Sequence, residues 1–135
     1  MALRYMLDTN ICIYTIKNKP QAVREYFQQH AQHLCISSIV LSELLYGAEK
    51  SDNPSKTLAV VESFAARLEV LNFDENAASH SAQIRAELAK QGTPIGHYDV
   101  LIAGHARSLG LVLVSNNTKE FERVDGLRLE NWTNA

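Results

Sequence analysis

Short apolar segments alternate along the chain with segments whose apolar residues recur at helical spacing. The apolar segments predict strands, and the helical spacing predicts helices. The predicted strands cover residues 3–7, 34–37, 68–73, 111–114 and 127–129, and the predicted helices cover residues 11–17, 21–30, 39–50, 54–68, 75–90 and 98–109. This alternation is typical of α/β proteins, so we predict a parallel sheet of about five strands with helices on both faces.

Residues that favour helix starts lie between these segments. Ser38 is predicted to cap the helix after the second strand, and Asp74 the helix after the third strand. Asn53 places a capping residue directly before Pro54, which suits the first helical position. No linker or change of composition divides the chain, so we predict a single domain over residues 1–135.

Asp8 directly follows the first predicted strand. Parallel sheets bind ligands in the crevice outside the carboxyl ends of their strands, so this position favours a site residue. An aspartate here is also a good cap for the helix that follows, and its position alone does not separate the two roles.

Glu43 lies on an apolar helix face together with Val40, Leu44 and Gly47. Burying an ionised carboxylate is costly unless a cation or strong hydrogen-bond donors compensate. We therefore expect Glu43 to face a pocket, a metal ion or an arginine. The alternatives are a position near solvent or a structural ion pair.

Asp99 repeats this pattern on a later helix, where it shares a face with Ala103 and Ala106. Together with Gly104, these small residues are predicted to let the helix approach the sheet closely and bring Asp99 toward Asp8. The alternative is an acid that is placed there only by its favourable interaction with the helix dipole.

Ser115–Asn117 follow the strand at 111–114 and add hydroxyl and amide oxygens at another carboxyl end. With the three acids they indicate an oxygen-ligand site, which suits Mg²⁺ or Mn²⁺ better than zinc. Cys12 and Cys35 lack metal-binding spacing and are predicted to be buried thiols. His97 and His105 lie near the third acid, and we assign neither a catalytic role.

Composition narrows the function classes. With 135 residues, 46% hydrophobic and 21% charged, the chain is typical of a globular domain and not of a disordered one. A net charge of -2 gives no overall basic surface, so nucleic-acid binding would depend on local patches and a metal ion. No apolar stretch reaches the roughly 18 residues of a membrane span, and Asp8 lies where a signal peptide would be apolar. We therefore expect a cytoplasmic protein without membrane contact.

Four short motifs occur in one order along the chain: Met6–Asn10 (MLDTN), Ser42–Gly47 (SELLYG), Ile95–Ala103 (IGHYDVLIA) and Asn116–Phe121 (NNTKEF). In this order and spacing the chain resembles the PIN-domain ribonucleases of the VapC toxin family. Each motif alone is weak, but together they cover the chain from Asp8 to Phe121 and make the resemblance specific.

The resemblance implies a single PIN domain over 1–135 with a three-layer α/β/α fold. It also implies an endoribonuclease that depends on Mg²⁺, with Mn²⁺ as the alternative metal, and cleaves RNA phosphodiester bonds with a metal-activated water. Asp8, Glu43 and Asp99 match the family's catalytic and metal-binding acids, and Asn117 matches a fourth metal position that is often Asp. Ser115 stands where Thr is usual. The neutral side chain of Asn117 removes one negative charge, which favours a single metal ion over two.

The same resemblance implies partners. A VapC toxin belongs to a type II toxin–antitoxin system and is neutralised by a cognate VapB-type antitoxin. It is expected as a homodimer within the toxin–antitoxin complex, with DNA contact only through the antitoxin. Similarity to enteric members implies a tRNA substrate, and more narrowly the anticodon loop of initiator tRNA.

Three other function classes are alternatives. A non-catalytic PIN-like binding module is an alternative because a fold does not fix a function, although all three acids are retained. A phosphoacceptor receiver domain has a similar length and acids at strand ends, with Asp74 in place of its acceptor. That class, however, needs an acidic pair after the first strand, whereas Asp8 is followed by Thr9 and Asn10. No GxGxxG follows the first strand, which argues against a dinucleotide-binding domain.

Overall fold

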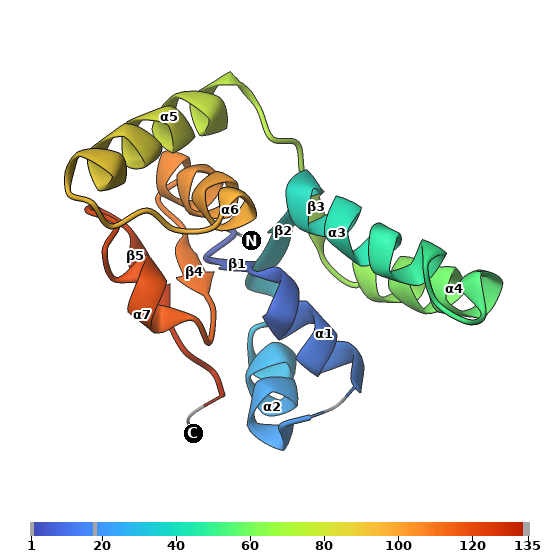
Figure 1. Cartoon of the computed structure of the whole chain (residues 1–135). Helices are drawn as coiled ribbons and strands as arrows, with labels where there is room; N and C mark the ends of the chain where they lie inside the picture. Colours follow the sequence, from blue (N-terminus) through green and yellow to red (C-terminus); the bar gives the residue numbers. More distant parts are fainter. Residues whose placement is uncertain (1, 18, 134–135) are drawn as a thin grey trace.

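The central element is a parallel sheet of five strands (Figure 1). The computed structural model describes residues 2–17 and 19–133, so residues 1, 18 and 134–135 of the predicted 1–135 domain lie outside the described residues. The strands are β1 (Tyr5–Leu7), β2 (Leu34–Ser37), β3 (Glu69–Leu71), β4 (Val112–Val114) and β5 (Arg128–Glu130). All neighbouring strands pair in parallel, which confirms the predicted fold class.

The strand order is β3-β2-β1-β4-β5, with β1 in the middle. This order places the ends of β1 and β4 side by side, since Leu7 pairs with Val114. The residues after these strands, which include Asp8 and Ser115, therefore meet at one edge of the sheet. Receiver domains have the order 2-1-3-4-5, so the topology excludes that alternative.

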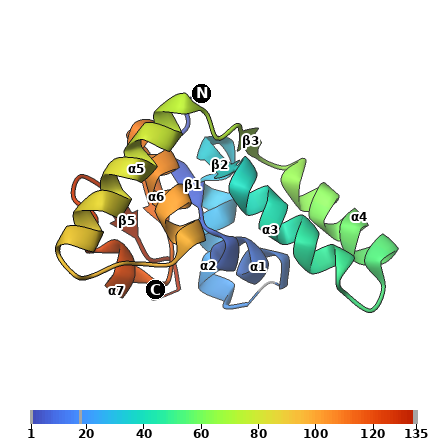
Figure 2. The same ribbon diagram turned by 45° about the horizontal axis from the view of Figure 1, so that its top comes forward.

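Helices cover both faces of the sheet. The described residues form α1 (Thr9–Lys17), α2 (Gln21–Gln29), α3 (Ser38–Glu49), α4 (Pro54–Ala65), α5 (Glu75–Lys90), α6 (His97–Ser108), α7 (Thr118–Phe121) and a short 3-10 helix, Ala31–His33. α1 and α2 lie on one side of the strands, and α5 and α6 lie on the other (Figure 1). α3 and α4 form an antiparallel pair that extends away from the rest of the chain (Figure 2).

The core confirms the predicted apolar pattern. β1 and β2 are buried along their whole length, whereas the edge strands β3 and β5 are largely exposed. Cys12 and Cys35 are free and buried, as predicted. In the part of the chain that the structure describes, no helix combines the length and apolar character needed to cross a bilayer.

Several predicted boundaries were wrong. The cap of α3 is Ser37 and not Ser38, because the Ser37 hydroxyl accepts a hydrogen bond from the Ile39 amide at 3.1 Å. The Ser38 hydroxyl instead accepts from the amide of Phe73 at 3.1 Å and thereby joins α3 to the segment after β3. α4 ends at Ala65, three residues before the predicted limit, and the one-turn helix α7 was not predicted.

The small residues of α6 do not all serve the predicted purpose. Ala103 and Ala106 are fully buried, in keeping with a close approach to the core. Gly104, however, faces α5, where an added Cβ would lie 2.7 Å from the Cα of Ser81. Its lack of a side chain therefore lets α5 and α6 approach each other, and the prediction that Gly104 packs on the sheet was wrong.

Candidate active site

Asp8 is positioned by the end of β1 and the start of α1. Its side chain is 5% exposed, and its Oδ1 accepts a hydrogen bond from the Ile11 amide at 2.9 Å. The Ser115 side chain, at the end of β4, also forms a hydrogen bond with this carboxylate. Asp8 thus caps α1 as the alternative interpretation proposed, but it does so at the carboxyl edge of the sheet where a ligand would bind.

Glu43 enters the same region from α3. Val40 and Leu44 on its helix face are buried, while Glu43 itself is half-buried. Its Oε1 accepts a hydrogen bond from the Thr9 hydroxyl at 2.7 Å, which ties α3 to the start of α1. A strong donor, rather than an arginine, therefore compensates for part of the cost of placing this carboxylate on an apolar face.

Asp99 lies in the first turn of α6 and shares an amide with a carboxylate that the sequence did not single out. The Nδ2 of Asn117 lies 3.5 Å from Asp99 Oδ2 and 2.7 Å from Glu120 Oε2. Asn117 is itself held in place, because its backbone N–H donates to the Ser115 hydroxyl at 2.9 Å. Asn117 therefore holds two carboxylates together through its side-chain nitrogen.

Glu120 is the site residue that sequence reasoning missed. It lies on the one-turn helix α7, three residues after Asn117, so both side chains are on one face of that turn. A single turn has no periodic hydrophobic signal, so the sequence predicted no helix at Thr118–Phe121 and assigned Glu120 no role. The spacing of three between an amide and an acid is the signal that would have identified it.

The charges of these acids act on one another. We call Asp8, Glu43, Asp99 and Glu120 the carboxylate cluster. Burial is the main cause that raises the pKa of Asp8, and the charge of Glu43 raises it further, against the hydrogen bonds from Ser115 and Ile11. Burial, a shared hydrogen bond with Glu120 and the charges of Glu120, Asp8 and Glu43 raise the pKa of Asp99 to about 6. Burial and like charges at close range thus both disfavour the ionised forms of Asp8 and Asp99.

The donor set of the carboxylate cluster fits a hard divalent cation. Among residues 2–17 and 19–133, the hydrogen bonds to these carboxylates come from hydroxyl, amide and backbone groups and not from Lys or Arg. Uncompensated carboxylate oxygens at one edge of the sheet are the ligands that Mg²⁺ binds. As the side chains stand, no three His, Cys, Asp or Glu residues in the described ranges are close enough to hold a metal ion together. Binding would therefore draw the carboxylates inward.

The sequence neighbours of Asp99 have different surroundings. His97 is exposed. His105 is 2% exposed, and its Nδ1 lies 2.8 Å from the Ser37 hydroxyl that caps α3. Burial lowers the pKa of His105, so the ring is neutral and joins α6 to α3. His105 therefore has a structural contact that accounts for it without a role in chemistry.

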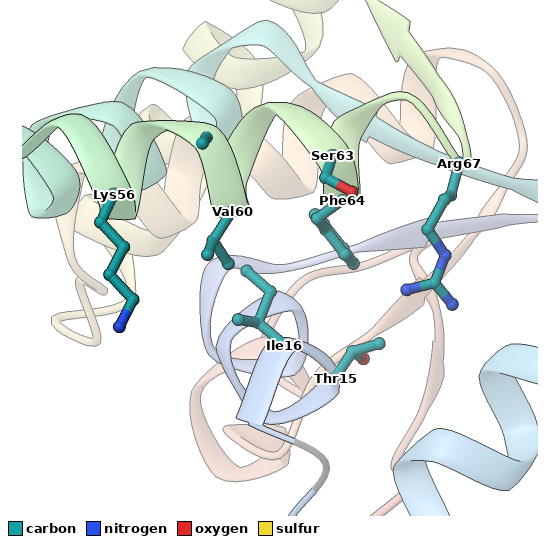
Figure 3. Close-up of a pocket in the computed structure, with 8 residues that line it drawn as sticks. Thr15, Ile16, Lys56, Val60, Ser63, Phe64 and Arg67 are labelled. Atoms are coloured by element: carbon teal, nitrogen blue, oxygen red, sulfur yellow. The ribbon is translucent and has the colours of Figure 1, made fainter.

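A second hollow, of about 450 Å³, lies between α1 and α4 and is separate from the carboxylate cluster (Figure 3). Lys56 and Arg67 lie at its two ends, and Ile16, Val60 and Phe64 lie between them. None of the residues that line it in the described chain is acidic. It lacks the oxygen ligands of the first site and is not a metal centre.

Known proteins match nearly the whole chain. The family model of the PIN domain matches residues 5–127. The tRNA(fMet)-specific endonuclease VapC of Shigella flexneri is 61% identical over 131 residues, which are 97% of this chain and 99% of that protein.

Chains in solved structures of VapBC complexes also have the same fold as this chain. The structure of DNA-bound VapBC from Salmonella typhimurium contains a chain that superposes with a TM-score of 0.92 at 62% identity, covering 96% of this chain and 98% of that one. VapBC2 from Rickettsia felis, bound to a DNA fragment from its promoter, gives a TM-score of 0.89 at 40% identity, covering 98% and 99%.

Proposed function

The chain belongs to the PIN-domain family and is a VapC-type endoribonuclease toxin, and we propose that it cleaves a tRNA at the carboxylate cluster. The observation that supports this location is the convergence of four acids without a Lys or Arg hydrogen-bond donor, as far as the described residues show, at the carboxyl edge of the sheet. Such an arrangement destabilises the folded chain, and its benefit lies in binding a cation and a phosphate.

The proposed substrate follows from the relatives. The enzyme of Shigella flexneri acts on tRNA(fMet), and this chain shares 61% of its residues over almost the full length of both. We therefore assign initiator tRNA as the substrate, with cleavage in the anticodon loop, where bases are unpaired and accessible. The products carry 5′-phosphate and 3′-hydroxyl ends.

PIN-domain nucleases typically depend on a metal ion, and we assign Mg²⁺ to this chain, with Mn²⁺ as the alternative. Asp8, Glu43 and Asp99 are the proposed ligands and catalytic acids, and Asn117 is proposed to offer its amide oxygen. Glu120 joins this set as an acid beside Asp99. Bound there, the ion supplies charge that stabilises the scissile phosphate and activates a water molecule.

The surrounding residues keep the acids in place for this task. The Ile11 amide and Ser115 fix the Asp8 carboxylate, and the Thr9 hydroxyl fixes Glu43. Asn117 keeps Asp99 next to Glu120. These contacts orient the acids before substrate arrives, and binding of the ion would then draw the carboxylates together.

The partner assignment is also a proposal. VapBC complexes from Salmonella typhimurium and Rickettsia felis bind DNA. We propose that this chain likewise forms a complex with a VapB-type antitoxin, as a homodimer within that complex. A net charge of -2 gives the toxin no overall basic surface for a duplex, and we assign DNA contact to the antitoxin alone.

Cleavage of purified initiator tRNA tests the function. Antitoxin-free protein is incubated with initiator tRNA and, separately, with elongator tRNA, in Mg²⁺ or in EDTA, and new 5′ ends are mapped. We expect one discrete cut in the initiator anticodon loop that EDTA abolishes. A folded protein that binds tRNA but never cuts it would instead support the non-catalytic binding module.

A matched pair of variants tests the site. Asp8 and Asp74 both cap helices, with amide hydrogen bonds of 2.9 Å and 3.0 Å to Ile11 and Ala77. Asn is as good a cap as Asp, so Asp8→Asn and Asp74→Asn should both fold. We expect Asp8→Asn to lower the cleavage rate by about 10³-fold or more and Asp74→Asn to leave it within about twofold. Equal rates for the two variants would remove Asp8 from the site.

A further inference from the structure

An open pocket of about 420 Å³ adjoins the carboxylate cluster on one side. Thr9 of α1, Glu43 and Tyr46 of α3, and Tyr98 of α6 line it, together with Lys50, the residue directly after α3. α3 and α6 are in contact with each other. The pocket therefore continues directly from Glu43, and whatever occupies it lies next to the acids.

The two tyrosines are unusually exposed. Tyr46 is 65% exposed and Tyr98 is 56% exposed. Every other Phe, Tyr and Trp side chain in the described residues is buried or half-buried. Both exposed aromatic rings thus line one pocket, although they come from different helices and are 52 positions apart in the sequence. Chance exposure of single aromatic residues does not account for this concentration.

An acidic, an aromatic and a basic side chain follow one another along one face of α3 and the residue after it. Glu43, Tyr46 and Lys50 are three and four residues apart and share one helix face. At a rise of about 1.5 Å per residue, the backbone positions of Tyr46 and Lys50 follow that of Glu43 by about 4.5 Å and about 10 Å along the helix axis. The Lys50 Nζ lies 4.9 Å from the centroid of the Tyr46 ring. The face therefore presents a carboxylate, then an aromatic surface, then a cation.

Unpaired nucleotides match this order. Single-stranded RNA binds proteins by stacking bases on aromatic rings and by placing phosphates near Lys or Arg. Lys50 supplies a positive charge in the pocket that Glu43 borders, and this charge favours the approach of an RNA backbone toward the acids. A protein segment could also cover exposed tyrosines, but the position of the pocket against Glu43 favours the strand that is being cut.

We propose that Tyr46 and Tyr98 form a subsite that stacks an unpaired base next to the cleaved phosphate, with Lys50 contacting the neighbouring phosphate. This proposal rests on the proposed cleavage of RNA. It explains how a chain without an overall basic surface holds a loop of RNA. The subsite would also favour an RNA loop over an RNA duplex, because the bases of a duplex are already stacked on one another.

Paired substitutions of each tyrosine test the subsite. Tyr46→Phe and Tyr98→Phe keep an aromatic face, whereas Tyr46→Leu and Tyr98→Leu remove it at similar size. We expect each Leu variant to raise the KM for initiator tRNA by about tenfold, with kcat within about threefold, and each Phe variant to stay near wild type. Lys50→Gln should reduce the salt dependence of tRNA binding by about one ion.

Two controls separate the outcomes. Binding of the same tRNA in EDTA, measured by fluorescence anisotropy, tests the subsite even if the wild-type protein does not cut, and a missing cut would count only against the proposed function. Wild-type cleavage with unchanged KM and unchanged tRNA affinity in both Leu variants would overturn the subsite. Loss of antitoxin binding in variants that keep their tRNA affinity would assign the tyrosines to a protein partner instead.

Discussion

The two ends of α6 differ in the surroundings of their polar side chains. Its first turn carries Asp99 into a group of like charges, where proximity to Glu120 and burial raise the pKa of Asp99 to about 6. Its last turns carry Gly104 and Arg107, which fit their neighbours closely. The Arg107 guanidinium donates to His80 Nδ1 at 2.9 Å, to the Asp125 carbonyl at 2.9 Å and to Gln83 Oε1 at 3.0 Å.

This difference indicates that the N-terminal end of α6 stabilises the fold less than its C-terminal end. Polar groups at the C-terminal end of α6 are paired, and α5 packs directly on Gly104. Carboxylates at the N-terminal end repel one another without a Lys or Arg hydrogen-bond donor in the described part of the chain. One helix thus holds a stabilising half and a functional half, and changes in the two halves should have separable effects.

The largest effect is expected from Asp99→Asn. Removing the charge takes away a proposed metal ligand, so cleavage should fall by about 10³-fold or more, which is about 4 kcal/mol of transition-state stabilisation. The same change relieves repulsion within the cluster, so the melting temperature should rise by a few degrees. Rates from mapped tRNA ends and calorimetry on the same preparation check both. A fall in both quantities would mean that Asp99 is chiefly structural.

Gly104→Ala should have the second largest effect, and on stability alone. The new Cβ would lie within 3 Å of the Ser81 backbone, so α5 and α6 must separate. We expect a loss of about 2–3 kcal/mol in the free energy of unfolding, measured by urea denaturation. Cleavage by the folded fraction should change little because Asp99 lies more than one turn away.

Gly47→Ala is the matched control for that loss. No atom lies within 4 Å of a Cβ added at Gly47, and this residue is also within a helix. Replacing an unconstrained helical glycine with alanine should stabilise the chain by about 0.5–1 kcal/mol. Equal destabilisation by the two substitutions would show that contact with Ser81 is not the cause.

Arg107→Met should cost less, about 1–2 kcal/mol, because its hydrogen bonds lie partly in solvent. Methionine keeps much of the apolar stem while it removes the donors to His80, Gln83 and the Asp125 carbonyl. Thermal denaturation measures the loss, and tRNA cleavage should be unaffected below the melting range. A drop in cleavage without a drop in stability would show that the two ends of the helix are coupled and do not act separately.

The sequence predicted the sheet and the positions of three acids for two physical reasons. Carboxyl ends of parallel strands meet at one edge, so Asp8 and Ser115 are brought together by topology. Glu43 and Asp99 were recognisable because a charge on an apolar helix face needs an explanation. For these acids, the sequence pattern was enough to predict where they lie in the fold.

The rest could not be predicted because it depends on side-chain contacts. Glu120 lies in a single turn without periodicity, and only the contact of Asn117 with both Glu120 and Asp99 connects it with the cluster. Gly104 was assigned to the sheet because small residues surround it on α6, but the sequence does not say which face meets α5. The capping serine was displaced by one position because either serine suits a helix start.

A pH dependence should arise at the functional end of α6. The pKa of Asp99 is about 6 in the folded chain against an ordinary value of 3.8. The folded chain therefore binds the proton more tightly, and the free energy of unfolding should fall as pH rises from about 4 to 6 and level off above that. In Asp99→Asn this slope of stability against pH should shrink, whereas in Arg107→Met it should persist.

The cleavage rate should change in the opposite direction. It should fall below pH 6 by about tenfold per pH unit, because the ionised carboxylate is the form that binds a cation. Denaturation and cleavage measured across the same pH series check both signs, and parallel slopes would contradict a shared origin in Asp99.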